Sequence, residues 1–577
     1  MKATVLWRVV RAEGLAAALD RLRDRQAEAR RRRSFRPASA PRPGFVSAVL
    51  NLAGAAPAPR LGGVQAQLLW RLETEAALRP VALLYPEERA ASRGYRLELQ
   101  SGKERRALYL PTAPRAAAAE PPAGAAPGGR DESAEHDGSE APNRGTDERA
   151  RADRGLDEEH RGPGEGPSAD RGTDGDASAD WREDEDASAE DLSASGRRLD
   201  GTPSRADGMP LCNVALADPE LERAVAWAAA HCGATLLQVE GLAGMPLGSL
   251  QRLRQAGLRL VLAVHDFAAF CPRPHLLESL PPPAPPRFCH YSRDALRCAR
   301  CLGRDAAGLA PGYQALRREL ARRLLASADA VVYPSSFLAR THDELFGGAG
   351  SAAARVIAPA GSPALLRSNR AIPRPGPRRS PRPPRHIAWV GAVQAHKGAL
   401  VFEAAVERLA AAGRRLRLSV YGGGDAEILT RWRRLPGLRV RGYYRAGSLP
   451  ALLRRDGVDL ALLLSIVPES YGLTLDECAA AAVPVVAFDH GAVAERIAAA
   501  RSGLLLAASL ADDPAAAGTA LAALLADLLD GRLEVPPPPI PPSPPASPLP
   551  PAVAAAAWIE LYRALGALGL RSSASSA

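Results

Sequence analysis

A regular alternation of buried strands and helices in the second half of the chain limits its possible folds most. From residue 386 to residue 488, aliphatic runs alternate with segments of helical periodicity. The predicted strands are 386–390, 415–421, 438–440, 458–464 and 484–488, and the predicted helices are 398–412, 425–434, 448–455 and 472–482. Strands that alternate with helices in this way predict a parallel, doubly wound sheet with right-handed crossovers.

The same α/β pattern occurs in the first half of the chain, where one long segment interrupts it. The predicted strands there are 45–50, 81–85, 236–239, 258–264 and 330–333, and the predicted helices are 65–77, 219–230, 247–256 and 313–327. Residues 112–209 contain 25 acidic and 12 basic side chains and almost no aliphatic ones. Such a segment cannot offset its ordering entropy by burial, so we expect a disordered acidic insert.

These patterns divide the chain into consecutive parts. In order, we expect a basic helical extension (1–42), a first α/β domain (43–111 and 212–369) split by the acidic insert (112–211), a linker (370–385), a second α/β domain (386–535), a Pro-rich segment (536–551), and a last helix and tail (552–577). The last helix is expected to cross back towards the first domain. At 577 residues, the chain is long enough for two domains that each bury a core.

Charge and cysteine content exclude several classes of protein. The net charge is +10, but the acidic insert alone carries −13, so the basic excess lies on the two domains. That excess suits anionic small molecules or a membrane surface, and no nucleic-acid-binding motif accompanies it, so we expect no nucleic-acid partner. Seven cysteines are too few for a secreted disulfide scaffold, and no long uncharged apolar run occurs. We therefore expect a cytoplasmic protein.

The N-terminal extension carries a second indication about location. Its amphipathic helical pattern ends in four consecutive arginines, Arg30–Arg33. A basic amphipathic helix can lie on an anionic lipid surface, although it can equally be a solvated helix. Peripheral contact with the inner face of a membrane is thus an expectation beside the cytoplasmic one.

The segment from Pro468 to Glu477 reads P-E-S-Y-G-L-T-L-D-E and lies between a predicted strand and the helix that follows it. In an open α/β sheet this is the carboxyl edge, where ligands bind. Gly472, Leu473 and Thr474 would form the helix N-terminus, whose free N–H groups and positive dipole end suit a phosphate. Glu469 and Glu477 would flank that helix end and accept hydrogen bonds from sugar hydroxyls.

The spacing of Glu469 and Glu477 resembles the E-x7-E motif of family 4 retaining glycosyltransferases, which have the GT-B fold. Other landmarks agree in order. They are L-G-G-V at 61–64, H-D-F followed by C-P at 265–272, P-S-S-F at 334–337, V-G at 390–391, H-K-G at 396–398, G-G-G-D at 422–425 and D-H-G at 489–491. The resemblance covers about 43–111 and 212–510. It implies two Rossmann-like domains facing a cleft, with the acceptor domain first and the donor domain second.

The resemblance also implies roles for individual residues. Glu469, His265 and Lys397 would be catalytic: Glu469 would hold hydroxyls of the transferred sugar, His265 would contact the donor sugar or the acceptor hydroxyl, and Lys397 would meet the diphosphate. The donor site would comprise Gly62, Gly63, Gly391, Lys397, Glu469, Gly472, Leu473, Thr474 and Glu477, the last of these on the ribose hydroxyls.

Lys397 stands out in composition, because the chain has 71 arginines and only three lysines, and no other lysine follows residue 103. A compact ammonium suits a phosphate as a point charge. Catalysis would then depend on neutralising the leaving group and on positioning, with no protein nucleophile assigned and no cofactor required.

Four of the cysteines lie close together in one irregular, Pro-interrupted segment. They are Cys271, Cys289, Cys298 and Cys301, and the last two form a C-x-x-C pair. Four thiolates could hold a structural zinc ion tetrahedrally, or they could be unpaired thiols. The sequence leaves both interpretations open, and zinc bound there would be structural rather than catalytic.

The function expected from these features is transfer of a sugar from a nucleotide-sugar donor to a glycan or lipid-linked acceptor, with retention of configuration, in the synthesis of surface polysaccharide or glycoconjugate. Two alternatives remain. A GT-B nucleotide-sugar epimerase has the same architecture but does not call for the E-x7-E context. A non-catalytic scaffold is favoured by Ala392, which stands where family members often have a phosphate-binding arginine.

Overall fold

The structure, a computed structural model, describes eleven stretches of the chain: 9–38, 45–54, 64–89, 92–112, 211–281, 284–306, 309, 312–362, 365, 383–534 and 549–568. Gly62 and Gly63 lie outside the described residues, as do nearly all of the expected insert, linker and Pro-rich segment.

The first domain is built on a nine-stranded sheet in the order β1-β5-β4-β3-β2-β6-β7-β10-β11. Its strands are β1 (Arg36–Pro37), β2 (Val49–Ala53), β3 (Val81–Arg89), β4 (Ser92–Ser101), β5 (Glu104–Pro111), β6 (Leu236–Glu240), β7 (Arg259–Ala263), β10 (Ala330–Tyr333) and β11 (Ala354–Val356). Its helices are α3 (Val64–Glu75), α4 (Pro219–Cys232), α5 (Leu247–Gln255), α6 (Ala295–Gly303), α7 (Tyr313–Ser327) and α8 (Ser336–Phe346). A separate two-stranded ribbon joins β8 (Leu277–Glu278) to β9 (Arg287–Phe288).

One part of this sheet corrects the expectation of a wholly parallel sheet. The strand β4 pairs antiparallel with both β3 and β5, and neither β4 nor β5 was expected from the sequence. The connections along β3-β4-β5 are two residues long, which only antiparallel neighbours can use. In β4, the buried apolar residues Tyr95, Leu97 and Leu99 alternate with polar ones, of which Glu98 and Gln100 are buried as well.

The second domain has a six-stranded sheet, parallel throughout, in the order β14-β13-β12-β15-β16-β17. Its strands are β12 (His386–Val390), β13 (Arg417–Tyr421), β14 (Leu438–Gly442), β15 (Leu460–Leu463), β16 (Val485–Phe488) and β17 (Gly503–Leu506). Its helices are α10 (Ala399–Ala411), α11 (Ala426–Trp432), α12 (Leu449–Asp456), α13 (Leu473–Ala480), α14 (Gly491–Ala500) and α15 (Pro514–Leu529). The strand order reverses between β12 and β15, which is the switch point where doubly wound sheets bind ligands.

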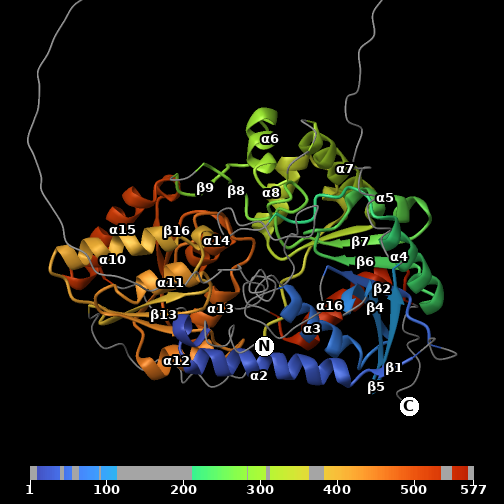
Figure 1. Ribbon diagram of the computed structural model, residues 1–577, viewed down its shortest axis with the longest axis horizontal. Coiled ribbons are helices and arrows are strands. Elements are labelled where there is room, and N and C mark those ends of the chain that lie inside the picture. Colours follow the sequence, from blue (N-terminus) through green and yellow to red (C-terminus); the bar gives the residue numbers. More distant parts are fainter. Residues whose placement is uncertain are drawn as a thin grey trace, which may run out of the picture. The chain divides into compact units, whose positions relative to one another are not determined.

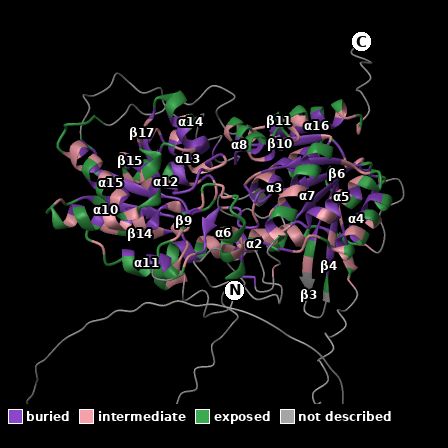
Figure 2. Ribbon diagram, turned by 90° about the horizontal axis from the view of Figure 1, so that it is seen from above, coloured by how far each residue is buried: buried purple, intermediate pink, exposed green. Residues whose placement is uncertain are grey.

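Each sheet is sandwiched between helices, as Figure 1 shows. Buried residues follow the strands and the inner faces of the helices, whereas exposed residues lie on the outer faces (Figure 2). The expected fold class, two Rossmann-like α/β domains of the GT-B type, is confirmed by these two sheets. The expected acidic insert lies outside the described residues apart from its first and last positions.

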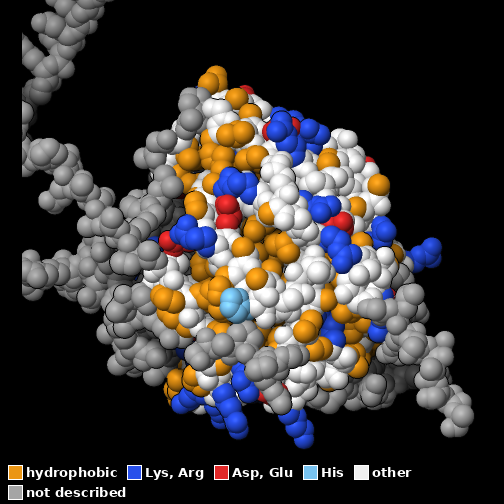
Figure 3. All heavy atoms as spheres, turned by 90° about the vertical axis from the view of Figure 1, so that its right-hand side faces the viewer, with side chains coloured by type: hydrophobic (Ala, Val, Ile, Leu, Met, Phe, Trp, Pro, Cys, Tyr) orange, Lys and Arg blue, Asp and Glu red, His pale blue; other side chains and the backbone are white. Residues whose placement is uncertain are grey.

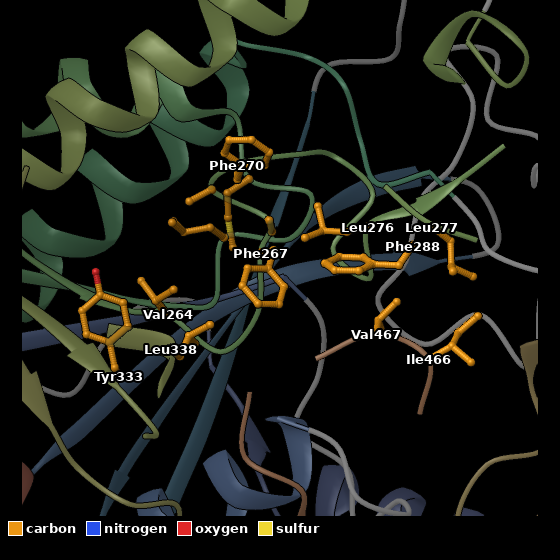
Figure 4. Close-up of a cluster of buried hydrophobic side chains, with 14 of the residues drawn as sticks. Val264, Phe267, Phe270, Leu276, Leu277, Phe288, Tyr333, Leu338, Ile466 and Val467 are labelled. Carbon is orange, nitrogen blue, oxygen red and sulfur yellow. The ribbon is translucent and has the colours of Figure 1, made fainter. Parts of the chain in front are cut away.

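Apolar side chains of the two domains meet beside the switch points. Ile466 and Val467, which follow β15, belong to the same buried cluster as Phe267, Leu276 and Phe288 of the first domain. Figure 4 shows these side chains facing one another. The loops at the carboxyl edges of both sheets therefore share one apolar contact.

The last helix, α16 (Pro551–Ala564), packs on the first domain as expected. Its residues Trp558, Leu561 and Tyr562 are buried against Val49 and Leu236 of the first sheet. The first domain thus contains an element that follows the whole second domain in sequence.

The N-terminal helix α2 (Leu15–Arg33) contacts both domains and runs beneath both sheets in Figure 1. At its beginning, the Glu13 carboxylate accepts a hydrogen bond from the backbone N–H of Tyr443 at 2.9 Å. Near its end, Arg31 pairs with Glu98 at 2.9 Å. The helix therefore links the loop after β14 to the antiparallel part of the first sheet.

Basic side chains are spread over the face of the first domain shown in Figure 3, singly and in small groups, with acidic side chains beside several of them. Within the described stretches, no helix is both long enough and apolar enough to span a membrane.

Candidate functional site

A cavity of about 250 Å³ lies where the carboxyl edges of the two sheets meet. The first domain contributes Gln67, His265, Asp266, Phe267, Pro274, His275, Pro334 and Pro359 to its wall, and the second domain contributes His396, Lys397 and the segment from Ser465 to Leu473 except Ile466. The cavity therefore adjoins the switch point between β12 and β15, as the sequence predicts for a ligand site.

Lys397 and Glu469, which follow different strands, form an ion pair in this cavity. The Nζ atom of Lys397 donates to Oε1 of Glu469 at 2.7 Å, and the two side chains are 30% and 20% exposed. A cation held by a single carboxylate in an open cavity can exchange that partner for an incoming anion. In this structure each of the two side chains is the hydrogen-bond partner of the other.

The loop before α13 is tightly constrained. Gly472 has φ 81°, and a Cβ atom there would lie 2.3 Å from Cγ2 of Val493, so only glycine fits. Arg496 donates to the carbonyl oxygen of Tyr471 at 3.0 Å and stacks over its ring, and it also pairs with Asp476. These contacts hold the amino end of α13 at the cavity wall, where Gly472 and Leu473 are lining residues.

The first domain also supports this loop. Ser335 caps α8 and donates its hydroxyl to the carbonyl oxygen of Ser470 at 2.6 Å. Because Ser335 follows β10, this bond joins the carboxyl edge of the first sheet to the loop that carries Glu469.

Gly391 and Thr474 lie beside the cavity and are not part of its wall. Gly391 has φ 116°, and a Cβ atom there would come 3.9 Å from Cγ2 of Thr474. The close approach of Gly422 to the Gly391 carbonyl leaves no room for a side chain at residue 422. The glycines after β12 and β13 therefore pack directly on each other next to the amino end of α13.

Glu477 does not share the cavity with Glu469. Its carboxylate is 9% exposed and accepts hydrogen bonds from the Gly447 backbone N–H at 3.1 Å and from the Tyr444 hydroxyl at 3.3 Å. Burial raises the pKa of Glu477 to about 7. Glu477 thus faces the loop that follows β14 and is not among the residues that line the cavity.

His265 lies two residues beyond the end of β7, after a strand as expected, and lines the cavity. Its Nε2 atom is buried and has no hydrogen-bond partner among the described residues. Burial, together with the nearby Arg71 guanidinium, lowers the pKa of His265 to about 4. The imidazole is therefore neutral at physiological pH and has an unused polar atom at the cavity wall.

Asp266 and His275 are among the cavity residues to which the sequence assigned no role. Asp266 lies beside His265 and accepts from the Ala268 backbone N–H at 2.8 Å, and burial raises the pKa of its carboxyl to about 6. His275 lies in an irregular segment between β7 and β8. The H-D pair after a strand was a signal for Asp266, whereas no periodicity or spacing singles out His275.

The four clustered cysteines also come together, in a small cavity of about 20 Å³. All four are free thiols, and the Ser279 backbone N–H donates to Sγ of Cys301 at 3.3 Å. Burial raises the pKa of Cys271 to about 12. Across the described ranges, no three His, Cys, Asp or Glu side chains are arranged to hold one metal ion.

Comparison with protein families finds a match in the second domain. Residues 384–527 match the family model described as "Glycosyl transferases group 1". The matched region runs from β12 into α15 and includes no part of the first domain. No curated protein matches the chain.

Several solved structures are similar to the chain at low identity. HepE from Anabaena in complex with UDP is 14% identical, over 60% of this chain and 82% of that one, with a TM-score of 0.34. Sucrose-phosphate synthase from Thermosynechococcus elongatus is 17% identical (60% and 78% covered, TM-score 0.36). A glycosyltransferase from Rickettsia africae is 12% identical (60% and 80% covered, TM-score 0.35). Identities this low say nothing about substrate.

Proposed function

We propose that the chain is a retaining glycosyltransferase of family 4 that moves a sugar from a nucleotide-sugar donor to a glycan or lipid-linked acceptor, in the synthesis of surface polysaccharide or glycoconjugate. The observation that carries this proposal is the Lys397–Glu469 pair beside the amino end of α13, in a cavity at the switch point of a domain that matches group 1 glycosyl transferases. That arrangement offers a cation and helix-terminal amides to a diphosphate, and a carboxylate to sugar hydroxyls.

The residues would act by exchange of partners. When the diphosphate of a donor enters, Lys397 transfers its hydrogen bonds from Glu469 to phosphate oxygens. Glu469 is then free to accept from hydroxyls of the sugar, and the amides at the start of α13 stabilise the charge that develops on the departing diphosphate. Preorganised donors of this kind typically contribute about 10²–10³-fold to a rate, one group at a time.

His265 would serve the opposite side of the cavity. A neutral imidazole with an unpartnered Nε2 can accept a hydrogen bond from a sugar or acceptor hydroxyl. Glu477, which faces the loop after β14, would accept from the ribose hydroxyls once that loop moves aside. No metal or cofactor is needed for these roles.

The proposal is tested first by binding and then by transfer. UDP-, GDP- and ADP-sugars are screened by thermal shift with the wild-type protein and with Glu477→Ala. We expect one nucleotide class to raise the melting temperature by several degrees, and the variant to lose that rise. Release of nucleoside diphosphate with candidate acceptors then tests transfer, and NMR of the product reports its anomeric configuration.

Two outcomes would contradict the proposal. If no nucleotide sugar shifts the melting temperature, the donor site is wrongly assigned. If one binds and no acceptor or water ever releases the nucleoside diphosphate, the non-catalytic scaffold is the better interpretation.

Membrane contact remains part of the proposal. On α2, Leu15 and Leu19 are 63% and 41% exposed, and Arg23 and Arg30 are exposed as well. An exposed face with leucines and arginines suits an anionic lipid surface. Co-sedimentation with phosphatidylglycerol vesicles, lost in a Leu15→Ser, Leu19→Ser variant, is the expected result, and equal sedimentation of both proteins would contradict it.

Structural zinc at the four cysteines also stays a proposal, supported by their convergence on one small cavity. Small side-chain rotations could bring the sulfurs together around an ion. We expect about one zinc per chain by elemental analysis, lost when Cys298 and Cys301 are replaced by serine. Four thiols that all react with a thiol reagent in metal-free protein would contradict this proposal.

A further inference from the structure

His275 is presented to the cavity by a strained turn. The residue after it, Leu276, has φ 55°, which is a costly conformation for a residue with a branched side chain. Two backbone hydrogen bonds of 2.9 Å hold the turn, from Leu276 N–H to the Arg273 carbonyl and from Cys289 N–H to the Leu276 carbonyl. As a result, the Leu276 side chain enters the apolar cluster seen in Figure 4, while His275 lines the cavity.

The ring of His275 stacks on a histidine of the other domain. Its centroid lies 4.4 Å from that of His396, and the two rings are inclined by 21°. His396 is 3% exposed, and its carbonyl oxygen accepts from the Ile466 backbone N–H at 2.9 Å and from the Ser465 hydroxyl. His396 is therefore a rigid platform that fixes the plane of the His275 ring.

Neither ring nitrogen of His275 forms a hydrogen bond with a described residue, although Lys397 and Glu469 are both close enough to influence the ring. Burial, together with the Lys397 ammonium, lowers the pKa of His275 to about 4, so the ring is neutral at physiological pH. A neutral imidazole offers one N–H donor and one acceptor. His275 thus brings an unused donor to the side of the cavity that holds the Lys397–Glu469 pair.

We propose that His275 is a donor-binding residue of the first domain, whose ring N–H donates a hydrogen bond to a phosphate oxygen of a nucleoside diphosphate while Lys397 neutralises its charge. This inference depends on the proposed function, because it names a further contact to the same donor. It also gives the strained turn and the stacked ring of His396 a purpose, since both hold the His275 ring at the cavity wall. The donor would then be held by both domains at its phosphates.

The experiment compares two histidine variants by isothermal titration calorimetry. His275→Phe keeps a flat ring that can stack on His396 but removes both nitrogens. His231→Phe, on the surface of α4, is the matched control. The ligands are inorganic pyrophosphate, the nucleoside diphosphate that binds the wild type most tightly, and the corresponding nucleoside without phosphate.

We expect His275→Phe to weaken pyrophosphate and nucleoside diphosphate at least tenfold and to leave the nucleoside unchanged. The His231→Phe control should bind all three as the wild type does. A purely structural role would weaken the nucleoside as well, so equal losses for all ligands would overturn the proposal, as would no loss for any of them.

Two further variants, His275→Gln and His275→Leu, provide the test if His275→Phe unfolds. His275→Gln retains an N–H donor and should bind pyrophosphate within about threefold of the wild type, whereas His275→Leu, which has no donor, should not. Equal binding by these two variants would overturn the proposal. If the wild type itself binds neither pyrophosphate nor any nucleoside diphosphate, the proposed function fails. If the wild type binds them and the His275 variants bind equally well, only the role of His275 fails.

Discussion

The two domains each contain a prominent ion pair, and the pairs differ in almost every respect. In the first domain, Arg71 pairs with Glu240, and their side chains are only 6% and 2% exposed. Arg71 also bonds to Glu75 at 3.0 Å and to Asn51 at 3.2 Å, and it stacks over Trp558. In the second domain, Lys397 faces a cavity and pairs, among the described residues, with the carboxylate of Glu469 alone.

The two pairs differ in how easily the cation can exchange its partner for a ligand. A buried guanidinium with several fixed partners cannot exchange any of them without a large desolvation cost. An ammonium with one partner in an open cavity can exchange that partner for a ligand at little cost. The Arg71–Glu240 pair is therefore fixed inside the first domain behind His265, whereas the Lys397–Glu469 pair can open, as the proposed donor site requires.

The largest effect is expected from breaking the buried pair. Glu240→Ala removes one of the two buried carboxylates that pair with Arg71 and leaves its charge only partly compensated in the protein interior, which should lower the free energy of unfolding by about 3–5 kcal/mol. Urea denaturation followed by circular dichroism measures this change. An Arg71→Met, Glu240→Leu double variant should recover most of the loss, because it removes both charges together and Glu75 keeps Arg79 as its partner. A single variant within about 1 kcal/mol of the wild type would show that the pair is not structural.

Breaking the open pair should have the opposite consequence. Lys397→Ala should lower turnover by about 10²–10³-fold, because the charge on the departing diphosphate loses its cation. The free energy of unfolding should change by less than about 1 kcal/mol, because the pair is partly exposed. Turnover assays and urea denaturation of Lys397→Ala and Glu469→Ala check both statements. Wild-type turnover in both variants would remove the site assignment.

A smaller effect should distinguish Glu477 from Glu469. Because burial raises the pKa of Glu477 to about 7, its carboxyl is mostly protonated at pH 6 and mostly ionised at pH 8. If the ionised form accepts the ribose hydroxyls, donor binding should be about tenfold tighter at pH 8 than at pH 6. Calorimetry at the two pH values measures this ratio, and Glu477→Gln should abolish it. A ratio that persists in Glu477→Gln belongs to another group.

The same carboxyl has a consequence for stability, with a definite sign. Its pKa rises from 4.5 in the unfolded chain to about 7 in the folded protein, so the folded state binds the proton more tightly. The free energy of unfolding should therefore fall as pH increases from about 4.5 to about 7 and then level off. Glu477→Gln should lack this contribution.

Much of the second domain could be predicted from the sequence, because each of its strands and helices has a clear pattern within its own segment. Each strand is a continuous aliphatic run, and each crossover helix has its own periodicity, so the order of elements fixes a parallel sheet. The same logic places Lys397 and Glu469 after strands β12 and β15. Their direct contact could not be predicted, since it depends on two loops 72 residues apart in the chain.

The first domain was harder to predict for physical reasons. The strand β4 alternates apolar with polar residues, and its Glu98 and Gln100 are buried by tertiary contacts, so it has no continuous aliphatic run to indicate a buried strand. His275 reaches the cavity because the next residue, Leu276, has a left-handed backbone conformation, which a leucine in the sequence does not predict. The separation of Glu477 from the cavity depends on its bonds to the loop at Tyr444 and Gly447, which are tertiary contacts.

The packing of α16 on the first sheet has a consequence for how the chain is made. The strands of the first sheet that α16 covers are β2, β6, β7 and β10, and all of them leave the ribosome long before α16 does. Roughly 200 residues separate the last of these strands, β10, from the helix, and translation adds about 5–20 residues each second. For roughly 10–40 seconds the apolar surface around Val49 and Leu236 lacks its cover. The second domain is continuous in sequence and can complete itself in that interval. During synthesis, the domain that begins first is therefore the one that finishes last, and its exposed sheet is the surface that a chaperone would need to protect.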